Sequence, residues 1–182
     1  AIAIIEDAAV PVDTMYSYYR EVKALIKSYD INAVYYGHAS VGLIHIRPEL
    51  DLSKEEDQKK MSGIARDISK IVKKYKGSLS GEHGDGRIRA PFLKEQFGAF
   101  VYQYFVNLKC IFDPNNLFNP GVILTDKVTF EDLRTVVSKK DIATAFSWKN
   151  DQSFYHAAEK CNGAGACRKS SGGAMCPSYR VT

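Results

Sequence analysis

Apolar side chains recur at three- and four-residue intervals in three stretches of this 182-residue chain, the spacing expected of amphipathic helices. The pattern predicts helices over residues 15–29, 53–76 and 94–112, each with one face that packs inward. Asp13 is a candidate N-cap for the first helix, and Ser53 opens a sequence with the form of a capping box for the second. Three helices are therefore expected before residue 113.

β-Branched and aromatic residues are concentrated in residues 1–7, 31–36 and 41–46, which predicts three β-strands. Gly37 and Gly42 bracket the connection between the last two strands, so we expect them to form a hairpin. The order of strand, helix, paired strands and helix is typical of an α+β fold. We expect a mostly antiparallel sheet covered by helices.

The composition changes along the C-terminal part of the chain. The periodic pattern weakens over residues 125–150, where a short helix is expected near residues 130–137, and Gly, Ala, Ser and Cys dominate after residue 151. We therefore predict a domain at residues 1–124, a linker or packing arm at 125–150, and a separate segment at 151–182. Both ends of the sequence resemble internal positions of a longer protein.

Charge and composition argue against several classes of protein. No apolar run approaches the roughly 20 residues of a membrane span, so none is expected. The net charge of +4 and the lack of like-charge runs predict no nucleic-acid partner. Four unevenly placed cysteines favour a reducing, cytoplasmic location, with peripheral binding to the inner face of the membrane left open. Cys110 is expected to be a small buried side chain.

The sequence Gly81-Glu82-His83-Gly84-Asp85-Gly86-Arg87 places two proton-active side chains between glycines, which tolerate close approach of another molecule. Two further histidines, His38 and His45, flank the turn of the predicted hairpin, where neighbouring side chains lie about 5 Å apart. Two histidines and a carboxylate often hold a catalytic metal ion, so His38, His45 and Glu82 are candidate ligands. His83 is then a candidate general base.

Simpler interpretations of the same residues remain open. The Glu-His stretch is also compatible with a polar turn, and a histidine in a hairpin with an ordinary hydrogen-bonded side chain. Asp85 fits either an outer partner of the metal ligands or an exposed turn carboxylate.

Three motifs occur in the order seen in FAD-linked oxidases: GHASVGLIH at residues 37–45, GEHGDG at 81–86 and FDPNNLFNPG at 112–121. Over residues 1–124 the chain resembles the C-terminal domain of the D-lactate, glycolate and D-2-hydroxyglutarate dehydrogenase group. The resemblance implies that His38, His45 and Glu82 bind a divalent metal ion, and the chemistry of two histidines and one glutamate suits zinc, iron or manganese. It also implies that His83 removes the substrate's hydroxyl proton and that Asn119 lies near the flavin.

Some positions depart from the pattern of this group. Residues 40–43 read Ser-Val-Gly-Leu where many members have Gly-Asp-Gly-Asn, and Val122 stands where a lysine often follows Asn-Pro-Gly. Polar contacts to the substrate are therefore expected to differ. Arg47, Arg87 and Arg89 are weak candidates for binding a substrate carboxylate.

The resemblance further implies an FAD-dependent dehydrogenase that oxidises a D-2-hydroxy acid of the D-lactate or D-2-hydroxyglutarate type to the 2-oxo acid. No glycine-rich pyrophosphate-binding stretch or other FAD-binding half is recognisable in the chain. We therefore expect its partners to include a missing FAD-binding domain. Alone, the chain should neither bind FAD tightly nor turn over substrate.

The histidine motif at residues 37–45 resembles the version found in the subgroup whose members are fused to an iron-sulfur module. This resemblance implies cysteines downstream. Cys161, Cys167 and Cys176 match that expectation and resemble the first 4Fe-4S cluster segment of a ferredoxin-like module. Three thiolates do not complete a four-thiolate cluster, so the rest of the iron-sulfur module is a further expected partner.

Two other functions are compatible with the same residues. One is a structural or electron-relay adaptor that binds metal only through its cysteine tail, and the other is a stand-alone zinc hydrolase. Loss of metal on substitution of His38 or Glu82, rather than of Cys167, distinguishes the dehydrogenase interpretation from the adaptor.

Overall fold

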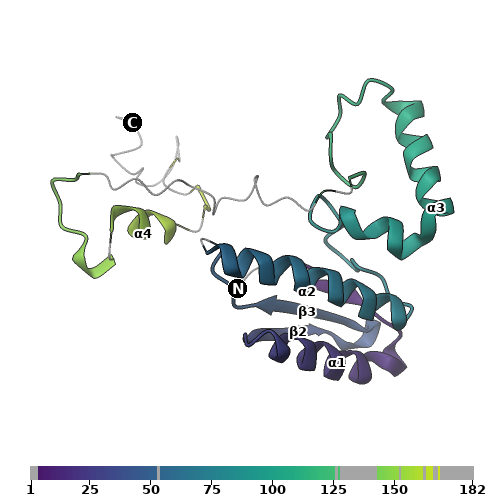
Figure 1. The fold of residues 1–182 in the computed structure, drawn as a ribbon, viewed down its shortest axis with the longest axis horizontal. Coiled ribbons are helices and arrows are strands. Elements are labelled where there is room, and N and C mark those ends of the chain that lie inside the picture. The colour runs from purple at the N-terminus through teal and green to yellow at the C-terminus, as the bar shows by residue number, and fades with distance from the viewer. Residues whose placement is uncertain are drawn as a thin grey trace. The chain divides into compact units, whose positions relative to one another are not determined.

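The computed structural model describes residues 4–52, 54–125, 127, 143–151, 153–161, 163–165 and 168 (Figure 1). The chain divides into two compact units, Ala1–Val136 and Val137–Thr182. The first unit contains all of the sheet and the three long helices. The predicted α+β class is confirmed. The proposed boundary near residue 151 stays a prediction.

The sheet has three antiparallel strands in the order β1-β3-β2, formed by β1 (Asp7–Ala9), β2 (Ala33–His38) and β3 (Leu43–Pro48). The predicted hairpin is confirmed: a short 3-10 turn, η2 (Ala39–Val41), and Gly42 join β2 to β3. Gly42 has φ 69°, and a Cβ there would lie 1.9 Å from the Val10 carbonyl oxygen, so this position requires glycine.

The first strand begins later than predicted. In the register that pairs Asp7 with His45, Ile4 would lie opposite Pro48, which has no backbone N–H to donate to a ladder. Ile4 and Ile5 instead enter as a buried bend whose side chains join the core.

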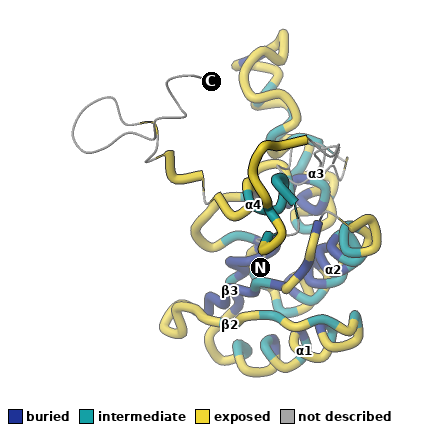
Figure 2. The backbone as a smooth tube through the Cα atoms, turned by 90° about the vertical axis from the view of Figure 1, so that its left-hand side faces the viewer, coloured by how far each residue is buried: buried dark blue, intermediate teal, exposed yellow. Residues whose placement is uncertain are grey.

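Two helices, α1 (Met15–Ser28) and α2 (Glu55–Lys74), pack against each other and cover one face of the sheet (Figure 1). Because side chains alternate along a strand, Ile44 and Ile46 of β3 point into the buried core beneath these helices. His45 and Arg47 consequently face the opposite side. Figure 2 shows the buried residues concentrated where the helices meet the strands.

The helix starts differ from the predicted caps. A 3-10 turn, η1 (Val12–Thr14), precedes α1, so its N-cap is Thr14 and not Asp13. The N-cap of α2 is Lys54, and neither Thr14 nor Lys54 makes a capping hydrogen bond to its helix through its side chain; the Thr14 hydroxyl donates to the Pro11 carbonyl instead. Ser53 lies outside the described residues. Both helices are therefore held mainly by their buried stripes, such as Met61, Ile64, Ile68 and Val72 in α2.

The segment that follows α2 lies alongside β1. Ser78 and Ala9 form an isolated antiparallel bridge, and the Gly81 amide donates to the Asp7 carbonyl at 2.8 Å. Residues 78–81 thus form only a brief extension of the sheet. This pairing places Gly81, and the loop that follows it, beside Asp7, the residue that pairs with His45.

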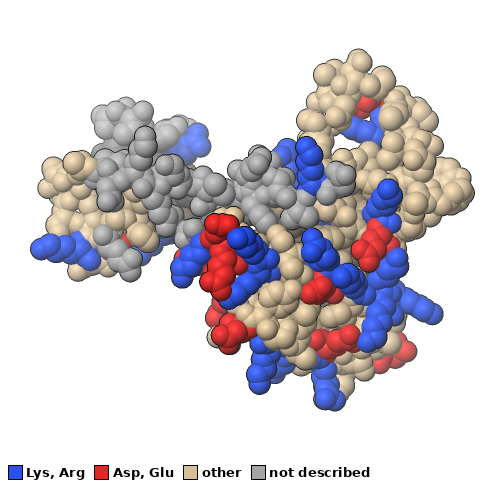
Figure 3. Space-filling model, in the orientation of Figure 1, with Lys and Arg blue, Asp and Glu red and all other residues tan. Residues whose placement is uncertain are grey.

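The last long helix, α3 (Ala90–Phe112), starts four residues before the predicted position and is kinked at Gly98, which has φ 81°. Its first turn is buried, but most apolar side chains after the kink are exposed, including Phe100, Leu108 and Ile111. Cys110 is exposed, so the prediction of a buried thiol is wrong: its part of the helix projects beyond the core. Figure 3 shows acidic and basic side chains interspersed over the sheet and helix layer, while α3 is mostly uncharged.

In the second unit the described residues form a 3-10 turn, η3 (Lys149–Asp151), and a short helix, α4 (Phe154–Glu159). The Ser153 hydroxyl caps α4 by accepting from the His156 amide, and Trp148 packs edge-on against Phe154. The helix predicted near residues 130–137 lies outside the described residues. Within the described part of the chain, no helix has the length and apolar character that a membrane crossing requires.

Candidate functional site

Four side chains predicted to act together come from two separate segments and meet in the structure. The β2–β3 hairpin supplies His38 and His45, and the loop that follows Gly81 supplies Glu82 and His83. The Nε2 atom of His38 lies 3.2 Å from one Glu82 carboxylate oxygen, and the Nε2 atom of His45 lies 3.8 Å from the other. His38 pairs with Leu43 in the ladder, so the two imidazoles are diagonal neighbours with ring centroids 5.5 Å apart.

The geometry of His38, His45 and Glu82 fits a metal ion. One ligand atom from each of the three lies within 4.8 Å of the others. Ligands about 2.1 Å from a tetrahedral zinc ion are about 3.4 Å apart, a value that the two observed nitrogen-oxygen distances bracket. His45 is buried and its Nδ1 atom has no hydrogen-bond partner among the described residues, whereas His38 and Glu82 are open to solvent.

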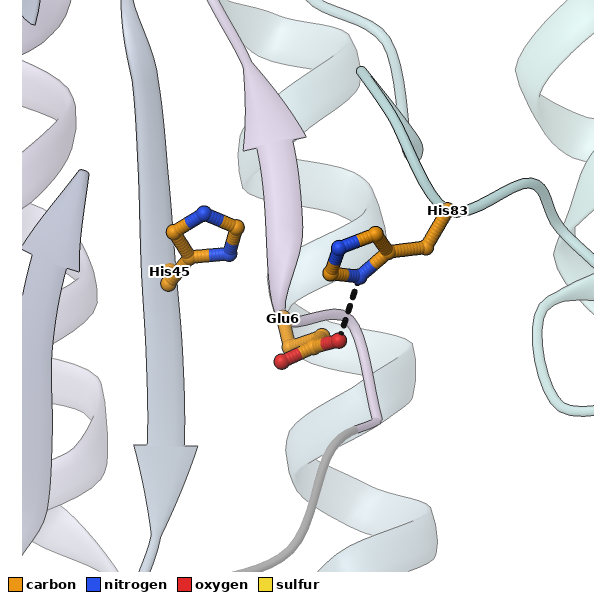
Figure 4. Close-up of side chains that lie close together, drawn as sticks. All are labelled: Glu6, His45 and His83. Atoms are coloured by element: carbon orange, nitrogen blue, oxygen red, sulfur yellow. Dashed lines mark hydrogen bonds and ion pairs between the residues drawn. The ribbon is translucent and has the colours of Figure 1, made fainter. Parts of the chain in front are cut away.

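A second acidic residue, Glu6, lies immediately before β1 and is buried. One of its carboxylate oxygens is 2.6 Å from Nδ1 of His83, and the other is 3.0 Å from the Arg47 guanidinium. Figure 4 shows His83 reaching from its loop toward Glu6, with His45 on the neighbouring strand. Glu6, His45 and His83 form a second group whose ligand atoms lie within 4.8 Å of one another.

Asp7, the next residue, holds the loop that carries Glu82 and His83. Its Oδ2 atom accepts hydrogen bonds from the Glu82 amide at 2.9 Å, the His83 amide at 2.8 Å and the Ser80 hydroxyl at 2.8 Å. Its Oδ1 atom accepts from the buried Arg89 guanidinium. Burial of Asp7 opposes its negative charge, but these hydrogen bonds and Arg89 outweigh that effect and lower its pKa to about 2.

The depressed pKa of Asp7 predicts how stability depends on pH. The folded-state pKa of about 2 lies below the ordinary value of 3.8, so the contribution to stability is present above about pH 4 and lost as the pH falls toward 2. The shift corresponds to roughly 2 kcal/mol. Urea unfolding at a series of pH values measures this loss. In an Asp7→Asn variant the free energy of unfolding should fall less steeply between pH 4 and pH 2. An unchanged fall would contradict the assignment of this pH dependence to Asp7.

Aromatic and basic side chains border the histidines on the same face of the sheet. The Tyr36 ring stacks on His45 with centroids 4.6 Å apart, and the Arg47 guanidinium lies 5.8 Å above Tyr36. The three arginines predicted as candidates for binding a substrate carboxylate differ in burial and in their partners. Arg89 is wrong as a candidate, because it is buried against Asp7, whereas Arg47 is partly exposed beside Glu6 and Arg87 is exposed.

The predicted flavin neighbour Asn119 lies in another part of the first unit. With Asp85 it lines a largely apolar cleft of about 580 Å³ between α3 and residues 118–124. The Ile123 amide donates to the Gly86 carbonyl at 2.9 Å, which ties this segment to the loop after His83. Burial raises the pKa of Asp85, and the charge of Asp7 adds to this while Arg89 opposes it.

The cysteine segment is described only in part. Cys161 is exposed, and its sulfur accepts a hydrogen bond from the Gly163 amide at 3.4 Å. Cys167 and Cys176 lie outside the described residues. The predicted cluster ligands therefore stay predictions.

Glu6 and Asp7 are the site residues that sequence reasoning missed, although the sequence contains a signal for them. They stand as two consecutive acids inside the apolar run Ile4-Ile5-Glu6-Asp7-Ala8-Ala9-Val10. A carboxylate buried in a strand requires partners, so an acid pair in such a run indicates a polar site.

The chain is similar in sequence to a known family and to several known enzymes. The family described as FAD linked oxidases, C-terminal domain, matches residues 1–123. A D-2-hydroxyglutarate dehydrogenase from Pseudomonas putida is 34% identical over 98% of this chain and 18% of its own length. One from Escherichia coli is 31% identical over 97% of this chain and 18% of its own length.

A D-lactate dehydrogenase from Archaeoglobus fulgidus is 31% identical over 65% of this chain and 26% of its own length. The chain therefore spans only a minor part of each of these relatives. The match over residues 1–123 nevertheless covers the sheet, the helices α1 to α3 and all four converging side chains. The chain belongs to the FAD-linked oxidase family, whose C-terminal domain it carries.

Proposed function

We infer that this chain is part of an FAD-dependent dehydrogenase that oxidises a D-2-hydroxy acid to the corresponding 2-oxo acid. The observation that carries this proposal is the convergence of His38, His45, Glu82 and His83 on one face of the sheet. D-2-Hydroxyglutarate is the favoured substrate, because several relatives are named for it and two of them match 97–98% of the chain, while another relative so named matches 64%. The D-lactate dehydrogenase matches 65%.

In this proposal the side chains divide the work of removing two hydrogens from a secondary alcohol. His38, His45 and Glu82 hold a divalent cation of zinc, iron or manganese. When bound, the cation supplies polarisation of the substrate hydroxyl, and FAD supplies the hydride acceptor. His83 accepts the hydroxyl proton as the C–H bond gives up its hydride.

Further parts of the whole protein belong to the same proposal. The FAD-binding half completes the site, and Asn119 contacts the flavin. Cys161, Cys167 and Cys176 contribute to a 4Fe-4S cluster that receives the electrons, with additional thiolates from the rest of an iron-sulfur module. The two D-2-hydroxyglutarate dehydrogenases that match 97–98% of this chain extend beyond residue 123, which supports assigning the cysteine segment to the same enzyme.

Metal analysis tests the ligand set on the chain itself. After loading with Mn²⁺ or Zn²⁺ and desalting, we expect His38→Ala and Glu82→Ala to lose most of the bound metal, because each leaves two ligands. Elemental analysis by mass spectrometry measures the stoichiometry. Glu21→Ala is a matched control, since Glu21 is a carboxylate paired with Lys74 elsewhere on the surface.

The cysteine tail provides the contrasting result for this metal experiment. A Cys167→Ser variant should retain the metal under the same loading conditions. If Cys167→Ser abolished binding while His38→Ala and Glu82→Ala left it unchanged, the site would belong to the tail and the ligand assignment would be wrong.

The substrate is tested in the flavoprotein assembled from this chain and its FAD-binding half. We expect reduction of an artificial electron acceptor with D-2-hydroxyglutarate, with a higher kcat/KM than for D-lactate or the L-enantiomers. The chain by itself should show no stoichiometric flavin absorbance. Lack of turnover with every D-2-hydroxy acid in a flavin-loaded preparation would overturn the proposed function.

A further inference from the structure

We propose that Glu6 is a positioning residue that holds His83 in one tautomer and orientation, with the proton on Nδ1 and the lone pair of Nε2 turned toward the metal-ligand set. This inference rests on the proposed function for the role of His83 as a base. The arrangement of Glu6 and His83 is itself observed in the structure (Figure 4).

The hydrogen-bonding capacity of Glu6 determines which nitrogen of His83 carries the proton. Glu6 is buried, and Arg47 lies 3.0 Å from one of its oxygens, which supports the carboxylate form. A carboxylate accepts hydrogen bonds and donates none. At 2.6 Å, the Nδ1 atom of His83 must therefore be the donor to the other oxygen, which in the neutral ring leaves Nε2 unprotonated.

The unprotonated Nε2 atom of His83 lies beside the proposed metal ligands, where a base is needed. The Nε2 atom of His83 lies 3.7 Å from a Glu82 oxygen, beyond direct hydrogen-bond reach, so no bond to Glu82 occupies it. The His83 ring is stacked 5.6 Å from the ring of His45 and is about half exposed. A substrate hydroxyl beside the His38, His45 and Glu82 ligands is consequently within reach of this nitrogen.

The backbone and the ring of His83 are each held by one of two consecutive residues, Asp7 and Glu6. Its backbone amide donates to Asp7, and its ring donates to Glu6. The two acids thus have separate tasks. Asp7 fixes the backbone conformation of the loop, and Glu6 fixes the orientation of the His83 ring.

An alternative role for Glu6 is as a metal ligand with His45 and His83, since these three also lie close together. Two observations favour the positioning role. The Arg47 cation already neutralises Glu6, and the Nδ1 atom of His83 is already bonded to it. A cation placed there would displace the bond to His83 and would lie beside a guanidinium.

Replacing Glu6 by glutamine tests the tautomer directly. The Arg47 guanidinium lies 3.0 Å from one Glu6 oxygen, and its positive charge favours the amide oxygen of the new side chain at that position. The NH₂ group then faces Nδ1 of His83 and requires an acceptor there. The proton then moves to Nε2. Imidazole ¹⁵N NMR spectra of the chain should show His83 protonated on Nδ1 in the wild type and on Nε2 in Glu6→Gln. The same tautomer in both proteins would overturn the proposal.

Metal content separates positioning from ligation. Glu6→Gln should bind Mn²⁺ or Zn²⁺ with the wild-type stoichiometry, whereas Glu82→Ala should not. Loss of metal from Glu6→Gln alone would make Glu6 a ligand and contradict the positioning role.

Kinetics of the assembled flavoprotein provide the functional readout. Glu6→Gln is expected to lower kcat by about 10²- to 10⁴-fold with little change in KM, because a ring protonated on Nε2 cannot accept the hydroxyl proton. Glu6→Asp keeps the carboxylate and should restore part of the loss. Glu21→Gln, which removes a carboxylate from an ion pair away from the site, should have wild-type kinetics.

The two proposals fail in different ways. If the wild-type flavoprotein oxidises no 2-hydroxy acid, the proposed function fails, while the NMR result still decides the tautomer. If the wild type is active and Glu6→Gln keeps the wild-type kcat, the positioning role of Glu6 fails and the function stands.

Discussion

Replacing His83 by glutamine should lower kcat of the assembled flavoprotein by about 10²- to 10⁴-fold, the usual contribution of a general base. Glutamine can still hydrogen-bond to Glu6, but it has no nitrogen able to accept a proton near neutral pH. KM should change little, since His83 is not among the proposed metal ligands. Steady-state kinetics with D-2-hydroxyglutarate measure both constants.

The metal content of His83→Gln provides the control. It should equal that of the wild type, because His38, His45 and Glu82 remain in place. A variant with normal kcat would remove His83 from the chemistry. A variant that lost its metal together with its activity would instead place His83 among the ligands, as the second group with Glu6 and His45 allows.

Replacing Asp7 by alanine is expected to lower the free energy of unfolding by about 3–5 kcal/mol, the cost of breaking a buried ion pair from one side. Arg89 is buried and would lose its carboxylate partner, and the amides of Glu82 and His83 would lose their acceptor. Urea unfolding at neutral pH measures the change. The altered loop should also weaken metal binding.

A double variant distinguishes loss of the ion pair from general damage. Asp7→Leu combined with Arg89→Met removes both charges and should be less destabilising than Asp7→Ala. Asp67→Ala is a surface control, because Asp67 accepts one hydrogen bond from Tyr29 and is partly exposed, so a loss of about 1 kcal/mol or less is expected. Equal losses for Asp67→Ala and Asp7→Ala would contradict the special role of Asp7.

The main elements of the first unit follow from local patterns in the sequence. The buried stripes of α1 and α2 repeat at helical spacing, and two glycines, Gly37 near the end of β2 and Gly42 just before β3, mark the turn of the hairpin. Local patterns were less informative for α3. Its apolar residues have helical spacing, but spacing alone does not tell whether another surface covers them, and Cys110 was wrongly expected to be buried.

By itself the sequence also predicted which side chains converge at the proposed metal site. His38, His45 and Glu82 were predicted from residue type and motif, and the structure brings them together because the Ser78–Ala9 bridge aligns the loop with the hairpin. Only the tertiary structure decided the contacts of Glu6, Asp7 and Arg89. Their ion-pair partners lie between 41 and 82 residues away in the chain, and sequence spacing carries no information about such pairs. A buried acid acquires its role from whichever donors folding places around it.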